Sequence, residues 1–466
     1  MSYADLKTIP ETIRAADQAI AALDNAFVTG FGRLSSADIE ALASLQRSFA
    51  ATPLGSAFAE AIAGIGRSEF LDRHFLVIAA ARSAVQGAAH DALIAQACAA
   101  LGRPLPTLET LNADAVQAAP PQIEVWLEST RQWLMELALA GFANLGVDIL
   151  LPFQATLDAI GGEPRLVRHA ALLSGLLGEF LAVFPTRGTP EVPPRRWADL
   201  WSRAMILCAA PPEPPSSRSC TGELRLFGAD LRQHDNFATL VAYGALYEQG
   251  HESTPRLVRA TASAFKVDVI QGTELAPLFS EIATTLLAGL AGCKKIQIDG
   301  MRLLDTGDLL WDDSKATSGG KIKPLTEAAA LLGQDPSSVP SARPTLAAAD
   351  RHPALIEELV YLGAGAFSFD AKSEVLPQLM IDDSPLTLAT DRWPSGDDLS
   401  QSDLGTAKEL FGLLRYDAGA WSLQPLAIAK SRGAPRMIAA SIVGGKSKRQ
   451  STLATLKERA SKLLRK

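Results

Sequence analysis

The chain has 466 residues and a net formal charge of −7; 47% of its residues are hydrophobic and 20% are charged. This composition excludes a disordered or collagen-like chain. Because ordinary domains contain about 100 to 200 residues, we expect two or three structural units. Many alanines and leucines beside only 6% aromatic residues favour a helix-rich fold.

The amino-terminal residues lack the basic segment, apolar segment and small-residue cleavage site of a secretory signal, so we expect a cytoplasmic protein. The best candidate for a membrane span, residues 134–153, contains Glu136, Asn144 and Asp148. Ionised side chains are costly near the centre of a bilayer. We therefore predict a buried helix there and no membrane span.

Cysteine and histidine spacing gives no indication of a metal centre. The four cysteines are far apart and include no C-x-x-C pair, and the six histidines lack the spacing of zinc ligands. We expect reduced thiols in a reducing compartment, no metal site and no cofactor.

From residue 9 to about residue 210, apolar side chains recur at helical spacing, as at Ile13, Ile20, Leu23 and Phe27. Glycine and proline residues interrupt the pattern and delimit helices near 69–101, 121–144, 163–184 and 196–209. Ser35 followed by Asp38 resembles a capping box. Residues 1–210 are thus predicted to form an all-α domain.

The segment 211–219 is rich in proline and serine and is predicted to be a linker. Beyond it, apolar and polar residues alternate, for example around Ile296 and Ile298, which indicates strands. A late strand is predicted at 421–428. Helical patterns are interspersed near 274–291, 325–333, 353–362 and 403–414. Residues 220–443 are predicted to be an α+β domain with an antiparallel sheet, so the fold class is α+β and helix-rich.

The last segment, residues 444–466, is predicted to be a basic amphipathic tail. From residue 446 onward it has eight lysines and arginines against one Glu458, which leaves about −14 on the rest of the chain. The tail could contact an acidic partner protein, the acidic body of this chain, a membrane surface or nucleic acid. We favour protein contact. The candidate partner-binding residues are Lys446, Lys448, Arg449, Leu453, Leu456, Lys457, Arg459, Lys462 and Leu463.

Asp305, Thr306 and Gly307, preceded by the alternating segment 296–304, resemble the catalytic loop of retropepsin-like aspartic proteases. In that family two such aspartates share a proton and activate water. Here the interval between Gly300 and Asp305 is short and the triplet is followed by Asp308, unlike in the family. A turn joining two strands explains the same residues by ordinary hairpin chemistry, and we favour that interpretation. Asp305 remains the catalytic candidate.

Other motifs have simpler structural explanations. The loop 440–447 fits a permissive phosphate-binding pattern, but too little chain follows it to build the required domain. The S-x-x-K segment 263–266 lies in a strand pattern. The acidic run 305–313 could bind Mg²⁺ or Ca²⁺, although a solvated hairpin is the favoured explanation. The interleaved arginines and tryptophans of 195–203 fit a single-stranded nucleic-acid site less well than a packing face.

The segments 196–201, 222–270 and 300–312 resemble parts of an uncharacterised bacterial family. Its members are encoded beside MoxR-type AAA ATPases, von Willebrand factor A-domain proteins and SWIM zinc-finger proteins. The resemblance brings no catalytic motif. It implies a component of a bacterial multi-protein assembly, in stress response or defence.

The sequence thus favours a non-enzymatic scaffold or adaptor subunit whose partners are other proteins of the same assembly. One alternative is an enzyme whose active-site residues are far apart in the sequence; the most specific candidate is a retropepsin-like aspartic protease with Asp305 as a catalytic residue. A second alternative is a nucleic-acid-binding protein that uses the basic tail, although an acidic body would repel phosphates elsewhere.

Overall fold

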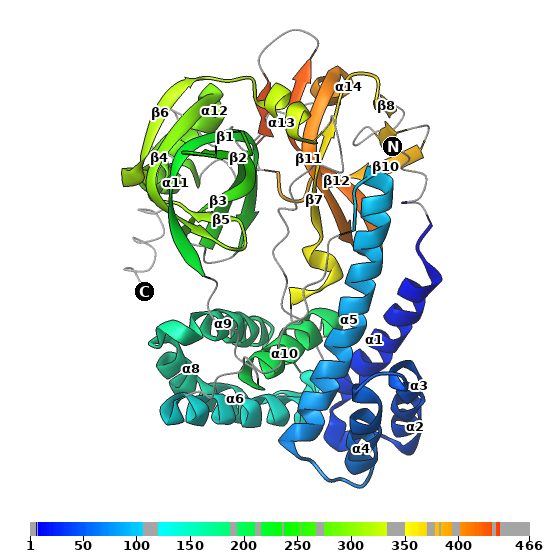
Figure 1. Cartoon of the computed structure of the whole chain (residues 1–466). Helices are drawn as coiled ribbons and strands as arrows, with labels where there is room; N and C mark the ends of the chain where they lie inside the picture. The colour runs from blue at the N-terminus through cyan, green and yellow to red at the C-terminus, as the bar shows by residue number, and fades with distance from the viewer. Residues whose placement is uncertain are drawn as a thin grey trace, which may run out of the picture.

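The computed structural model of the chain describes residues 6, 8–105, 120–186, 193–209, 216–234, 237–251, 253–266, 275–332, 350–370, 378–381, 384–393, 401–430 and 435–438. Its described parts form three bodies (Figure 1). A helical body lies at the bottom of the view, a small barrel at the upper left and a second sheet at the upper right.

The helical body packs its amphipathic helices around one apolar core that includes Phe27, Phe142, Trp197 and Trp201. The predicted capping box is confirmed, because Ser35 accepts from the backbone of Asp38 and the Asp38 carboxylate accepts in return. The helices are α1 (Glu11–Thr29), α2 (Ser36–Ser44), α3 (Gln46–Phe49), α4 (Leu54–Gly66), α5 (Asp72–Leu101), α6 (Pro121–Ala140), α7 (Val147–Leu150), α8 (Gln154–Gly161), α9 (Val167–Ala182) and α10 (Pro194–Ala209).

The apolar stretch 134–153 does not form one long helix. Helix α6 ends at Gly141, and a short 3₁₀ turn and α7 follow. Leu134, Leu137 and Leu150 are fully buried in the core of the helical body. None of the helices within the described ranges has both the length and the apolar character needed to cross a bilayer.

The first sheet of the C-terminal region closes on itself as a barrel. Its order is β1-β2-β3-β5-β4-β6, and β1 also pairs with β4; the pairs are antiparallel except for β3 with β5. Two helices, α11 (Ala276–Ile282) and α12 (Thr284–Gly292), lie between β3 and β4 and contribute Phe279 and Leu286 to the barrel core. The strands are β1 (Ser217–Gln233), β2 (Phe237–Glu248), β3 (Arg256–Phe265), β4 (Lys294–Leu304), β5 (Asp308–Leu310) and β6 (Ala316–Lys321).

The closed path β1-β2-β3-β5-β4-β1, with a helical connection from β3 to β4, is the connectivity of the OB-fold. In that fold the outer face of the second and third strands often binds ligands. Fold does not by itself establish function, so the outer face of the barrel must be judged on its own residues.

The second sheet has the order β7-β11-β12-β10-β9-β8, and β13 pairs with β12. Its pairs are antiparallel apart from β10 with β12. Helix α13 (Pro324–Leu332) contacts both β1 and β7 between the two sheets, and α14 (Gln401–Gly405) precedes β11. The strands are β7 (Glu357–Leu362), β8 (Ser368–Asp370), β9 (Gln378–Ile381), β10 (Ser384–Leu388), β11 (Ala407–Asp417), β12 (Ala420–Lys430) and β13 (Arg436–Met437).

The predicted fold class, α+β and helix-rich, is confirmed, and so are the strands predicted at 296–304 and 421–428. Two predicted helices are wrong. Residues 357–362 form β7, and residues 407–417 form β11 after the short α14. β11 lies between β7 and β12 and is buried from Leu410 to Tyr416, so its apolar run is continuous. β7 lies at the edge of the sheet and its burial alternates, but apolar residues occupy both of its faces from Leu359 to Leu362, so its sequence does not show a period of two.

Long helix α5 connects the helical body to the second sheet (Figure 1). Leu93, Ala97 and Leu101 from its second half share a core with Leu410 and Ile428 of β11 and β12. The N-terminal helices and the C-terminal sheet therefore have common packing. Division of the chain into folding units at 210–219 stays a prediction, and Ser217 to Ser219 already belong to β1.

Barrel and second sheet meet face to face through apolar side chains of β1, β2, β11 and β12. Phe227 and Phe411 pack edge to face, with ring centroids 5.7 Å apart. Gly228 lies against this pair, and a Cβ added there would come within 2.8 Å of Leu426 Cβ and 3.0 Å of Phe411 Cδ1. The close approach of the two sheets therefore requires glycine at position 228.

We predict that Gly228→Ala destabilises the protein by about 1–3 kcal/mol, because the methyl group overfills this junction. A matched control is Gly175→Ala in α9, where an added Cβ meets no atom within 4 Å. That change should stabilise by about 0.5–1 kcal/mol, since alanine is the better helix former. Urea denaturation of both variants measures the difference; equal stabilities would contradict the tight junction.

Candidate functional site

The Asp305 loop is a hairpin turn between β4 and β5. Gly307 N donates to Leu304 O over 3.0 Å and Gly307 has a φ of 83°, which requires glycine at this position. The exposed Asp305 carboxylate accepts from Ser216 N (3.2 Å) and Ser216 Oγ (2.8 Å). Its geometry is that of a cap on the start of β1. The turn interpretation is confirmed, and the contacts of Asp305 within the described ranges do not include a second aspartate.

The other residues of the acidic run are dispersed by local structure. Asp308 accepts from Arg259 over 2.8 Å, whereas Asp312 caps Ser314 and Asp313 caps Thr285 in α12. Within the described part of the chain, groups of three or more histidine, cysteine or carboxylate side chains able to hold a metal ion do not occur.

The arginines and tryptophans of α10 form a packing face. Trp197 and Trp201 are 1% and 0% exposed, and Trp201 Nε1 donates to Leu134 O over 2.7 Å. Arg196 pairs with Glu179 on α9. These tryptophan rings are thus unavailable for stacking on nucleic-acid bases.

A buried polar cluster joins α1, α5 and α10 to residues 350–352. Arg82 is 1% exposed, donates to Asp24 over 2.9 Å and also pairs with Asp199. His352 Nε2 lies 3.1 Å from the second oxygen of Asp199. Burial alone would raise the pKa of Asp199, but the contacts with His352 and Arg82 hold that pKa below its usual range.

Asp199 and His352 superficially resemble a catalytic aspartate–histidine pair, and Ser83 lines the same small cavity. Yet the other ring nitrogen, His352 Nδ1, accepts from Ala354 N over 3.1 Å, so neither nitrogen is free to activate a serine. The cavity measures about 10 Å³, the space of a single water molecule. The cluster therefore holds two parts of the chain together and has no room for a substrate.

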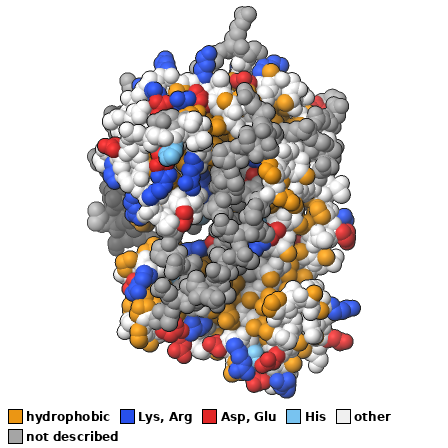
Figure 2. Space-filling view, in the orientation of Figure 1, with side chains coloured by type: hydrophobic (Ala, Val, Ile, Leu, Met, Phe, Trp, Pro, Cys, Tyr) orange, Lys and Arg blue, Asp and Glu red, His pale blue; other side chains and the backbone are white. Residues whose placement is uncertain are grey.

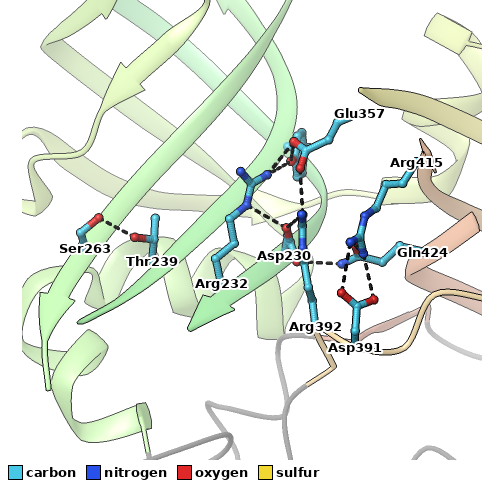
Figure 3. Close-up of polar contacts among 10 residues, drawn as sticks. Asp230, Arg232, Thr239, Ser263, Glu357, Asp391, Arg392, Arg415 and Gln424 are labelled. Carbon is cyan, nitrogen blue, oxygen red and sulfur yellow. Dashed lines mark hydrogen bonds and ion pairs between the residues drawn. The ribbon is translucent and has the colours of Figure 1, made fainter. Parts of the chain in front are cut away.

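A second buried network lies where the barrel meets the second sheet (Figure 3). Asp230 on β1 is 1% exposed and accepts from Arg232 and Arg392, both over 2.9 Å, and from Gln424 Nε2 on β12 over 2.7 Å. Arg232 and Arg392 also pair with Glu357 of β7, over 2.7 and 2.8 Å. Two carboxylates and two guanidiniums thus balance one another inside the junction.

The pKa values in this network reflect that balance. Burial would raise the pKa of Glu357, but the adjacent Arg232 and Arg392 guanidiniums hold it below its usual range. Burial raises the pKa of the Tyr243 phenol, whose hydroxyl receives a bond from Arg232. Arg415 extends the network by donating to Gln424 and to Asp391. Burial would also raise the pKa of Asp391, but the bonds from Arg415 hold that pKa below its usual range. Glu357 and Asp391 are thus ionised and Tyr243 is neutral at pH 7.

An open groove of about 570 Å³ lies on the outer wall of the barrel, lined by Glu223, Arg225, Tyr247 and Gln297 among others. Its charged groups already pair with one another. Glu223 accepts from Arg225 and from Lys295 over 2.7 and 2.6 Å, and the Arg225 guanidinium lies 4.0 Å above the Tyr247 ring. The charged side chains that line the groove therefore already have partners of opposite charge, which weakens their attraction for a charged ligand.

Sequence reasoning missed Arg82, Asp199, Asp230, Glu357 and His352. Three of these residues could have been noticed in the sequence, because each is a charged residue within or next to an apolar run: Arg82, Asp230 and Glu357. The candidate residues of the tail and the loop 440–447 lie outside the described residues.

In comparisons with models of protein families, with functionally characterised proteins and with solved structures, no significant match to the chain was found. Function must therefore be argued from the geometry above.

We predict that Asp305→Asn costs less than about 1 kcal/mol, because an asparagine oxygen can still accept from Ser216. Biological activity should also persist, as a turn residue takes no part in chemistry. Thermal unfolding and complementation of a deletion strain measure the two effects. Loss of activity in a folded variant would restore the protease hypothesis.

We predict that Glu357→Gln costs about 2 kcal/mol at pH 7, because the partly buried Arg232 and Arg392 guanidiniums lose one of their two counter-charges and keep only Asp230. Since the pKa of Glu357 is lower in the folded protein, its ionisation stabilises the fold above the ordinary value of 4.5, and this contribution is lost as the pH falls through the lowered pKa. The gap between wild type and variant should shrink below pH 4 in urea denaturation. A gap independent of pH would contradict the assignment.

Proposed function

We propose that the protein is a non-enzymatic scaffold or adaptor subunit of a bacterial multi-protein assembly in the cytoplasm. The family resemblance suggests partners of the MoxR-type ATPase and von Willebrand factor A-domain classes, with a role in stress response or defence. The support from the structure is what its buried polar side chains do: they join distant parts of the chain to one another.

One observation supports this proposal most strongly. Each of the principal buried ion-pair groups links segments that lie more than 100 residues apart: Arg82 with Asp199, Arg103 with Glu358, and Asp230 with Arg392. Such contacts hold the helical body, the barrel and the second sheet in fixed positions. A fixed spacing between surfaces is what a scaffold needs.

The helical body also has apolar side chains on its surface. Val147, Leu151, Val167 and Leu181 are 44–59% exposed on α7, the turn after it and α9. Hydrophobic side chains gather over α8 and α9 at the lower left of the molecule in Figure 2. Apolar side chains grouped on a surface often mark protein contacts.

A second candidate function is binding of single-stranded nucleic acid, favoured by the OB-type connectivity of the barrel. The charge of the barrel opposes it. Residues 216–332 contain twelve lysines and arginines but fourteen acidic residues, and Figure 2 shows both signs interspersed on this body. Arg218 and Arg259 are paired with Glu248 and Asp308, which weakens any attraction for phosphates.

The proposal is tested by purifying the tagged full-length chain from its native cells and measuring the stoichiometry of co-purifying proteins. We predict that a MoxR-type ATPase or von Willebrand factor A-domain protein is recovered in near-stoichiometric amount. The double variant Leu151→Glu and Val167→Glu should lower recovery about tenfold, because two exposed contacts become charged.

A control is Leu355→Glu, which changes a leucine that is 45% exposed and lies outside the helical body. It should leave recovery unchanged. Absence of any stoichiometric partner, together with retention on single-stranded DNA at about 0.15 M salt, would contradict the scaffold proposal and favour the second candidate.

A further inference from the structure

The outer face of β2 and β3 is half buried and half exposed. The side chains of β2 that point into the barrel core are Ala238, Leu240, Ala242 and Leu246, so the intervening residues point outward. Of the outward residues, Val241, Tyr243 and Ala245 are 5% exposed or less and pack against the second sheet. The same face continues beyond Val241 to Thr239 and Phe237, and Phe237 is 39% exposed.

The exposed half presents aromatic and hydroxyl side chains. Phe237 and Phe265 are direct partners across β2 and β3 and are 39% and 91% exposed. The His234 ring stacks on Phe237, with centroids 4.5 Å apart. Thr239 and Ser263 form the next outward pair, and their hydroxyls meet over 2.9 Å, apart from the buried network (Figure 3).

Neighbouring strand β5 extends this exposed half. Leu310 is aligned with Thr261 of β3 and is 38% exposed. Asp312 follows two residues later, and its side chain is 46% exposed. Three large apolar side chains thus share one face of the barrel, with a carboxylate beside them. Burying an aromatic ring such as Phe265 is favourable, and apolar side chains grouped on a surface often mark a contact site.

The described chain ends beside this face. Met437 of β13 belongs to the same apolar cluster as Val241 and Tyr243, and Ile438 is 2% exposed. The fourteen residues between Ile438 and Leu453 could span up to about 45 Å when extended. The C-terminal tail therefore starts within reach of the exposed half.

We propose that the exposed half of the barrel face is the docking site of the chain's own C-terminal tail, residues 444–466. In a helix, Leu453, Leu456 and Leu463 share one side, which matches an apolar surface such as Phe237, Phe265 and Leu310. The tail's charge of +7 complements about −14 on the rest of the chain. Tethering makes the contact intramolecular and raises its effective concentration.

Charge also argues for this occupant over nucleic acid. A nucleic acid would be repelled by the net charge of about −14 on the chain outside the tail, whereas a basic amphipathic segment is attracted by it and can also cover the phenylalanines. The buried half of the same face already packs against apolar side chains of the second sheet, Phe411 and Leu426. We expect the exposed half to bind apolar side chains of the tail in the same way. This inference does not depend on the scaffold proposal.

The test is site-specific photo-crosslinking in the full-length protein. Phe265 is replaced by p-benzoyl-phenylalanine, and cross-linked peptides are identified by mass spectrometry. We expect a product of monomer size that joins position 265 to residues 446–466. The same photoreactive residue at Val167 in α9, which is 59% exposed, should give little of this product.

Two tail variants test the contact itself. Leu456→Glu should lower the yield from position 265 about tenfold, because a charge would have to enter the apolar contact. Ser451→Glu adds the same charge on the opposite side of a helix and should leave the yield unchanged. Moderate salt should lower the yield only slightly, since salt screens the charge attraction but not the apolar contact.

The proposal is overturned if position 265 cross-links to no tail residue. A product of dimer size that grows with protein concentration would assign the face to a second copy instead. Cross-linking to an added single-stranded oligonucleotide in place of the tail would assign it to nucleic acid. Each of these three results excludes the tail as the occupant.

Discussion

Pairing of buried charge, among the residues that the structure describes, is the constraint on which the fold depends. Asp230 is a carboxylate almost fully withdrawn from water, and an unpaired charge in that position would cost several kcal/mol. Arg232, Arg392 and Gln424 supply its partners from β1, from the segment after β10 and from β12. These donors reach Asp230 together only when the barrel and the second sheet are packed in their native relative position. Folding of one sheet therefore specifies the position of the other.

The same rule connects the helical body to the C-terminal region. Arg82 is a buried residue of α5 that pairs with Asp24 of α1 and Asp199 of α10. His352, from the segment before β7, contacts the same Asp199 carboxylate. Buried pairs of this kind add specificity more than net stability, because desolvation offsets much of their attraction. They fix the relative positions of surfaces, which is consistent with the proposed scaffold role.

Much of the fold could be predicted from the sequence, and the polar junctions could not. Helical spacing and glycine stops locate the N-terminal helices, since each helix packs one stripe on a common core. Strand β11 was missed because both of its faces are covered, so residues such as Phe411 and Leu413 show no alternation. Strand β7 was missed because apolar residues also occupy its partly buried face, so its sequence does not alternate. Asp305 could be assigned to a turn from its own triplet. Asp230, Glu357 and His352 could not be grouped, because their contacts join residues more than 100 positions apart or lie in connecting segments.

The most direct test of this account is native-state hydrogen exchange of the full-length protein. If buried ion pairs make one cooperative body, the slowest amides of α5, β2 and β12 should share one opening free energy. In Asp230→Asn, that energy should fall for β2 and β12 together, because their common junction is weakened. Three unrelated opening energies in the wild type, or a change confined to β1 in the variant, would contradict the account.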